Sequence, residues 1–384
     1  RDKLKTILNK PSTTIIGFNS VNYDVPMVKG YLTNFSNAKL KKLSDYIIVD
    51  NQQGWQIENK FDFEKFRSSH VDLANIAAGV ASLKLYGGRI KAPTLQDLPI
   101  EPQHTITTCR AEALRTYCIN DLDLTRLLHD ELSEQIALRR LMSKEYKIDL
   151  LSKSDAQIAE AVFRYELTKA DISVGKAEYP SDFSFNYEVP DFISFTSKVL
   201  CEVLETVKSS SFTLSDKGSV LLPKELNKKV LFKGAYYKFG IGGLHSCEKN
   251  QAVISGKDEI LVDKDVTSYY PNIILNQNLY PEHLTKKFND VYKRIVDKRV
   301  AAKKSGDKVT NESLKVVINS SFGKFGSRYS NLYSPSLLVQ TTITGQLSLL
   351  MLIEMLSNIG VVIYSANTDG IVMKYKKDIN DHVL

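Results

Sequence analysis

A run of strand-forming residues ends in an acid and passes directly into a helix near the middle of the chain. The apolar stretch Glu259–Asp265 is typical of a buried strand. Ser268 is a suitable cap for a helix over residues 268–278, and Pro271 lies in its first turn, where a missing N–H costs nothing. We therefore expect the Asp265 carboxylate at a strand end beside helix N–H groups, a place suited to a divalent metal and phosphate. The alternative is an acid that only begins a turn.

Composition indicates a soluble chain of more than one domain. Its 384 residues are too many for one ordinary core, so two or three domains are expected. Charged residues make up 25% and hydrophobic residues 43%, and no apolar run approaches the roughly 20 residues of a membrane span. The four cysteines show neither a CxxC pair nor zinc spacing, which favours buried thiols in a reducing compartment.

The net charge of +7 is concentrated in one short segment. Between His283 and Lys308 there are nine Lys or Arg residues and three Asp residues. This segment is predicted to be a helix over residues 288–304 that ends at Ser305-Gly306. Such a basic helix is either a solvated face or a phosphate-binding surface.

A second helix is predicted to begin near Asn311. Lys315, Asn319 and Phe322 recur at i, i+4 and i+7, so they share one face. That face offers a cation for phosphate, an amide, and a ring that can pack on a base pair. An amphipathic helix with a solvated lysine and a core phenylalanine is the alternative.

Three further regions have a recognisable pattern. Residues 1–150 are predicted to be α/β, with a strand over residues 13–18 and a helix over residues 112–138. Adjacent glycines, Gly242 and Gly243, permit close approach of another backbone, including that of a nucleic acid, although a glycine hairpin explains them equally well. Residues 361–366 and 371–375 are predicted strands joined at Asn-Thr-Asp-Gly, which is also an ordinary hairpin turn.

Together these segments resemble family B DNA polymerases. Asp-x-x-Ser-x-Tyr-Pro from Asp265 resembles motif A, and Lys-x3-Asn-Ser-x-Phe-Gly from Lys315 resembles motif B. The turn with Asp369 resembles motif C, with Asn367 in place of its first Asp, a variant similar to one in phage polymerases. Arg299-x3-Lys303 resembles the fingers pair that grips the triphosphate.

The resemblance implies a role for each matching residue. The acids would be catalytic and would bind two Mg²⁺ ions, for which Mn²⁺ can substitute: Asp265 and Asp369. Nucleotide binding is implied for Tyr270, Arg299, Lys315 and Asn319, with the ring of Tyr270 excluding a 2′-hydroxyl. Nucleic-acid binding is implied for Gly242, Gly243, Phe322 and Gly323.

Two motifs near the N-terminus resemble those of proofreading 3′–5′ exonucleases, which have a ribonuclease-H-like fold. They place four residues in an exonuclease site: Asn19, Asp24, Tyr117 and Asp121. The first motif of that family, Asp-x-Glu, has no match in residues 1–12, so little exonuclease activity is expected. We expect the chain to be a fragment that lacks this motif and also the thumb domain.

The resulting expectation is a multidomain α/β and α+β protein that acts as a DNA-directed DNA polymerase on primer–template DNA and dNTPs. Its predicted parts are a ribonuclease-H-like exonuclease domain, a connector with the start of the palm, a palm of antiparallel sheet and helices, a short two-helix fingers, and a second palm segment: residues 1–150, 151–235, 236–285, 286–327 and 328–384. Replication accessory proteins are further expected partners, a membrane is not, and the expected location is the cytoplasm of a bacterial host if a phage encodes the chain. A non-catalytic nucleic-acid-binding fragment is the alternative, and a stand-alone nuclease is disfavoured.

Overall fold

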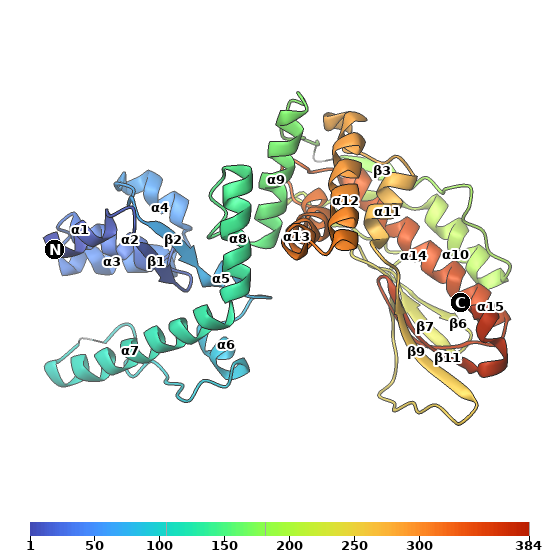
Figure 1. Cartoon of the computed structure of the whole chain (residues 1–384), viewed down its shortest axis with the longest axis horizontal. Helices are drawn as coiled ribbons and strands as arrows, with labels where there is room; N and C mark the ends of the chain where they lie inside the picture. The colour runs from blue at the N-terminus through green and yellow to red at the C-terminus, as the bar shows by residue number, and fades with distance from the viewer. Residues whose placement is uncertain (105, 181, 384) are drawn as a thin grey trace. The chain divides into compact units, whose positions relative to one another are not determined.

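The chain divides into two compact units, Arg1–Ile158 and Ala159–Leu384. The structure is a computed structural model that describes residues 1–104, 106–180 and 182–383 (Figure 1). It is a mixed α/β structure with helices and antiparallel sheets, as the sequence predicts at that level. The division falls within helix α9 (Asp155–Lys169), a few residues after the predicted end of the first domain.

Unit 1 contains a short parallel pair of strands and several helices. Strand β1 (Thr14–Gly17) lies in register with β2 (Ser69–Asp72), so that Gly17 stands opposite Asp72. The helices of this unit are α1 (Asp2–Leu8), α2 (Asp24–Leu32), α3 (Asn37–Ile48), α4 (Gly54–Phe61), α5 (Leu73–Ile76), α6 (Leu83–Arg89), α7 (Thr108–Glu131) and α8 (Ser133–Tyr146).

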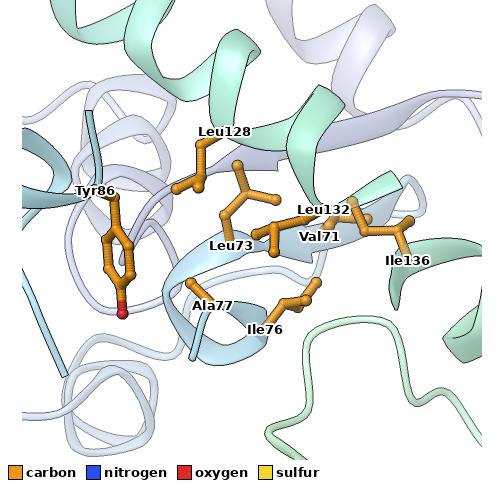
Figure 2. Close-up of a cluster of buried hydrophobic side chains, with 8 residues drawn as sticks. All are labelled: Val71, Leu73, Ile76, Ala77, Tyr86, Leu128, Leu132 and Ile136. Atoms are coloured by element: carbon orange, nitrogen blue, oxygen red, sulfur yellow. The ribbon is translucent and has the colours of Figure 1, made fainter. Parts of the chain in front are cut away.

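One apolar cluster joins β2 to the long helices of unit 1. Figure 2 shows its side chains, which come from β2, α5, α6, α7, α8 and the residues between them: Val71, Leu73, Ile76, Ala77, Tyr86, Leu128, Leu132 and Ile136. The single helix predicted over residues 112–138 is wrong, because the chain leaves α7 and starts α8 at Leu132. The sequence gives no sign of this break, since apolar residues keep helical spacing through it and neither Gly nor Pro marks it.

Unit 2 is larger and contains two antiparallel sheets in the described part of the chain. The smaller has the order β3 (Ser184–Asn186), β4 (Ser211–Leu214), β5 (Val220–Leu221). The larger has the order β6 (Lys229–Phe232), β7 (Ala235–Lys238), β8 (His245–Ser246), β10 (Val362–Asn367), β11 (Gly370–Lys376), β9 (Glu259–Asp265). Figure 1 shows strands of this six-stranded sheet side by side although they are far apart in sequence.

The two faces of the six-stranded sheet differ in burial. One face carries buried apolar side chains, with Tyr237, Phe239, Ile371 and Met373 at most 4% exposed. The other face includes Asp265, which is exposed. This arrangement follows from the period-two alternation of strand side chains.

The helices of unit 2 are α10 (Lys198–Ser209), α11 (Tyr269–Asn276), α12 (Lys287–Ser305), α13 (Lys308–Phe325), α14 (Pro335–Asn358) and α15 (Asn380–Val383), with short 3₁₀ turns η1 (Glu282–Leu284) and η2 (Lys377–Ile379). Helices α12 and α13 pack together as a pair, turned at Gly306, whose φ is 77°. The Asp307 side chain caps α13 by accepting the Thr310 N–H at 3.1 Å.

Helix α14 differs from one expectation drawn from the sequence. By length and composition alone it is apolar enough to cross a membrane, contrary to the prediction that no run approaches that length. Within the protein, however, 72% of the apolar 18-residue stretch of this helix is buried, as in the core helix of a soluble protein.

The cysteines also differ from expectation. Cys118 and Cys201 are exposed and Cys247 is partly exposed, so the prediction of buried thiols is wrong for the first two. Cys109 lies outside the residues whose side chains are described. Cys118 lies on α7, where it lines a cavity of unit 1, and Cys201 lies on α10. The spacing of the cysteines in the sequence does not reveal whether each side chain is buried.

Candidate functional site

Two acids from distant parts of unit 2 meet at one end of the six-stranded sheet. Asp265 is the last residue of β9 and stands opposite Gly370, the first residue of β11. Asp369 occupies the turn just before that strand, and its carbonyl accepts the Val266 N–H at 2.8 Å. Strand pairing thus places the two acids side by side, although more than a hundred residues separate them in the sequence.

The two carboxyl groups interact electrostatically. Burial raises the pKa of Asp369, the neighbouring charge of Asp265 raises it further, and a backbone hydrogen bond opposes both effects. A cation between the acids would relieve this repulsion. No group of three or more His, Cys, Asp or Glu side chains placed to hold a metal occurs in the part of the chain that the structure describes, so the pair stands alone.

Gly370 lies directly beneath the Asp265 carboxylate. A methyl group at this glycine would lie 2.1 Å from Oδ1 of Asp265, far inside contact distance. The hairpin turn is tight as well, since Thr368 adopts a φ of 60° and its N–H donates to the Leu244 carbonyl at 2.8 Å. The absence of a side chain at Gly370 therefore provides the space that the Asp265 carboxylate occupies.

Tyr270, in the first turn of α11, is fixed from two sides. Its hydroxyl donates to the Gly242 carbonyl at 2.7 Å, and its ring stacks on Phe322 of α13 with centroids 4.5 Å apart. On α14, a methyl group at Gly345 would lie 3.0 Å from the Tyr270 ring, so this glycine permits the close packing of α11 on α14. The ring is thus held rigidly beside the acid pair.

The glycine segment before β8 packs onto the hairpin turn. A methyl group at Gly243 would lie 2.8 Å from Oγ1 of Thr368. The buried Gln346 side chain of α14 bonds Gly240 at both ends, accepting its N–H at 3.0 Å and donating to its carbonyl at 2.8 Å. In this structure the glycines contact the protein's own turn and tyrosine, and their predicted contact with nucleic acid stays a prediction.

Arg299 reaches the turn that follows β9. Its Nη1 donates to Oγ of Ser268 at 3.3 Å, while its Nε is buried without a hydrogen-bond partner among the described residues. Ser268 was expected to cap α11 through its side chain, and this is wrong: it has a left-handed φ of 52° and makes no side-chain cap bond. The guanidinium group at Ser268, three residues after Asp265, can donate hydrogen bonds to an anion.

The remaining predicted residues of α13 are exposed. Lys315 makes an ion pair with Glu312 of its own helix at 3.6 Å, and Asn319 and Gly323 are exposed on the helical face that includes Phe322. Because Phe322 stacks on Tyr270, that face is turned toward α11. Within the described part of the chain, neither Lys315 nor Asn319 makes a hydrogen bond or ion pair with Asp265 or Asp369.

In unit 1, three of the four predicted exonuclease residues line one cavity of about 690 Å³, namely Asp24, Tyr117 and Asp121. Burial and the hydrogen bond to Asp121 raise the pKa of Tyr117 to about 12. Burial also raises the pKa of Asp24. Asn19 lines a different hollow, and its backbone N–H donates to Asp72 at 2.7 Å.

Two residues at the unit 2 site were not singled out from the sequence. Gln346 has only a weak signal, as one of two glutamines in a helix rich in apolar residues. Gly370 has none, because a glycine after Asp is also the ordinary residue of a hairpin turn.

Comparison with known proteins supplies a fold and no more. No protein-family model matches the sequence, and no curated protein matches it. The solved structure of the family B DNA polymerase from the hyperthermophilic archaeon Pyrobaculum calidifontis has a similar fold, with a TM-score of 0.51 and 16% sequence identity. The match covers 96% of this chain and 46% of that polymerase, so the chain spans less than half the length of its structural neighbour.

Proposed function

We propose that unit 2 catalyses template-directed addition of deoxynucleotides to a primer 3′-hydroxyl, as a family B type DNA polymerase. The observation on which this depends is the pairing of β9 with β11, which sets Asp265 beside Asp369 at the end of an antiparallel sheet. In this proposal the sheet with α11 and α14 is the palm, and α12 with α13 forms short fingers. The fold shared with a solved family B DNA polymerase supports the proposal.

The acid pair suits a hard divalent cation. Carboxylate oxygens are the ligands that Mg²⁺ prefers. Burial and, after it, the charge of Asp265 raise the Asp369 pKa, and a bound cation would neutralise the repulsion between the two charges. Asp265 and Asp369 would hold Mg²⁺, which in such sites lowers the pKa of a bound hydroxyl and stabilises charge on phosphoryl oxygens.

The neighbouring residues position the substrates. The Tyr270 ring, held by Gly242 and Phe322, would pack against the sugar of the incoming nucleotide and exclude a 2′-hydroxyl. Arg299 and Lys315 would neutralise the triphosphate, and Nη1 of Arg299 already reaches Ser268 in the turn after β9. Asn319 would contact the nucleotide, and Gly323 would leave room for the new base pair.

Replacement of one acid tests this function. We expect Asp369→Asn to reduce single-nucleotide incorporation by at least about 100-fold, because a charge that stabilises the transition state is lost. Binding of primer–template DNA should change little, as measured by fluorescence anisotropy. Asp263→Asn is the matched control, since Asp263 lies on the same face of β9 two residues earlier and should leave incorporation unchanged.

The rival function, a nucleic-acid-binding protein without catalysis, predicts a different result. Wild-type protein would then bind the duplex but incorporate no nucleotide with Mg²⁺ or Mn²⁺. Equal loss of binding and incorporation in Asp369→Asn would count against the assignment of this acid to chemistry.

For unit 1 we propose an exonuclease-like domain with little activity of its own. Asp24 and Asp121 line one cavity with Tyr117, which supports a nuclease-like arrangement, but two-metal cleavage needs several carboxylates around the metals. We expect only slow degradation of 3′-labelled single-stranded DNA in Mg²⁺ or Mn²⁺. Rapid release of nucleotides that disappears in Asp121→Asn would show that this expectation is wrong.

A further inference from the structure

A row of residues crosses the six-stranded sheet from the acid pair to the opposite edge strand. Each residue stands in register with the next one, strand by strand from β9 to β6: Asp265, Gly370, Asn367, His245, Lys238 and Lys229. Residues directly opposite on neighbouring strands project from the same face of a sheet. The acid site and three basic residues therefore lie in one line on one face. We call the three basic residues the lysine row: His245, Lys238 and Lys229.

This line lies on the exposed face of the sheet. The three basic residues are all exposed: Lys229, Lys238 and His245. Tyr237, next to Lys238 on β7, projects from the opposite face into the core and is 1% exposed. β6 and β7 belong to the same sheet of unit 2 as β9 and β11 (Figure 1), with β8 and β10 between the two pairs. A long ligand lying on this face could contact the acids and the basic residues together.

The two lysines form an unfavourable pair in the free protein. They stand directly opposite each other, where like charges destabilise a sheet. Among the residues that the structure describes, neither lysine has an ion-pair partner. Protection of a sheet edge explains a lysine on β6, the edge strand, but not Lys238, because β7 lies between β6 and β8.

The spacing of the row matches a nucleic-acid strand. Neighbouring strands lie about 4.8 Å apart, so His245, Lys238 and Lys229 are roughly 14, 19 and 24 Å from Asp265 along the row. Successive phosphates of one DNA strand advance about 3.4 Å along the helix axis. The basic residues thus correspond to phosphates about four to seven nucleotides from the acids.

We propose that Lys229, Lys238 and His245 bind backbone phosphates of the strand being extended, about four to seven nucleotides behind its 3′ end. This rests on the proposed function, which puts the 3′-hydroxyl of that strand at Asp265 and Asp369. Because the row starts at those acids, the strand that ends there follows it, and the template strand lies farther away. The occupant is the sugar–phosphate backbone of DNA, bound by charge and without regard to base sequence.

The first test is the salt dependence of primer–template binding by the full chain. We expect the double variant Lys229→Gln/Lys238→Gln to bind at least about tenfold more weakly at 0.1 M salt, with a slope of log K against log salt smaller by about 2. Lys233→Gln is the matched control, because Lys233 is exposed in the turn of the same hairpin but outside the row. Unchanged binding in the double variant, or an equal effect of the control, would overturn the proposal.

The second test identifies the strand. Neutral methylphosphonate linkages are placed four to seven nucleotides from the primer 3′ end, or at the paired template positions. With wild-type protein the modified primer should bind more weakly than the unmodified primer. With Lys238→Gln this loss of affinity should be several-fold smaller, because the variant has already lost the contact. We call this dependence of the modification's effect on Lys238 coupling. Coupling to the template positions alone, or no coupling at either strand, would contradict the proposal.

Incorporation by the wild-type protein, measured on the same DNA, separates this inference from the proposed function. Incorporation without coupling refutes phosphate binding by the lysine row and leaves the proposed polymerase function standing. Coupling without incorporation supports the row as a phosphate-binding surface and refutes the catalytic function.

Discussion

Gly370 has no side chain, yet it determines where the carboxylate of Asp265 can stand. Oδ1 of Asp265 occupies the space that a methyl group on this glycine would need, at 2.1 Å from the added carbon. The atom in conflict is the end of a flexible side chain, so the strand can keep its place while the carboxylate turns away. Position 370 therefore affects the site much more than it affects the fold.

We expect Gly370→Ala to reduce nucleotide incorporation by about 100-fold, because displacement of a reacting group by about 1 Å has an effect of this size. The free energy of unfolding should change by less than about 1 kcal/mol, because the carboxylate can move into solvent. Single-turnover incorporation and urea denaturation measure the two effects. Gly88→Ala, at a position with open space around it, is the control for the added methyl group. A large loss of stability with normal incorporation would contradict the argument.

Individual elements follow closely from the sequence wherever a local signal marks their ends. Gly306 ends α12 and the Asn-Thr-Asp-Gly turn separates β10 from β11, near the predicted positions. The break at Leu132 was missed because both neighbouring helices contribute to one apolar cluster with continuous spacing. The lysine row could not be predicted, since it depends on β8 pairing with β10 and no local pattern encodes the register of strands so distant in sequence.

A buried acid joins two elements of unit 2. Glu354 of α14 is 3% exposed, and its carboxylate accepts the N–H groups of Thr196 and Ser197 at 2.9 and 2.7 Å, at the start of α10. Burial raises the pKa of Glu354, but these hydrogen bonds outweigh it, and the net pKa lies below the usual 4.5. The charged form therefore stabilises the fold.

We expect Glu354→Gln to destabilise unit 2 by about 1–3 kcal/mol at pH 7, because one buried N–H group loses its acceptor. The folded-state pKa is depressed, so the stabilisation is complete above pH 4.5 and is lost as the pH falls through the lower folded value. Urea denaturation from pH 7 to pH 3 should thus show the difference between wild type and variant shrinking with acid. A stability difference that stays constant with pH would mean that the charge of the Glu354 carboxylate does not contribute to stability.

At the scale of the whole molecule, the chain separates two kinds of site. The acid pair and the lysine row belong to unit 2, and the cavity with Asp24 and Asp121 belongs to unit 1. Each unit has a core of its own: Leu43, Ile47, Ile57 and Phe63 form one cluster in unit 1, and α13 buries Ile318 in unit 2. Two separate cores predict that damage to one unit spares the other.

A matched pair of substitutions tests this independence. We expect Ile57→Ala to destabilise unit 1 by about 2–5 kcal/mol, since it removes a fully buried side chain. Trp55, the single tryptophan, lies on the same helix, so its fluorescence in urea reports unit 1. Hydrogen exchange of residues 159–384 and nucleotide incorporation should stay as in wild type. Ile318→Ala, at 1% exposure in α13, should do the reverse, raising exchange in unit 2 without moving the Trp55 transition. If either substitution shifts both transitions together, the two cores unfold as one cooperative body and the sites are energetically coupled.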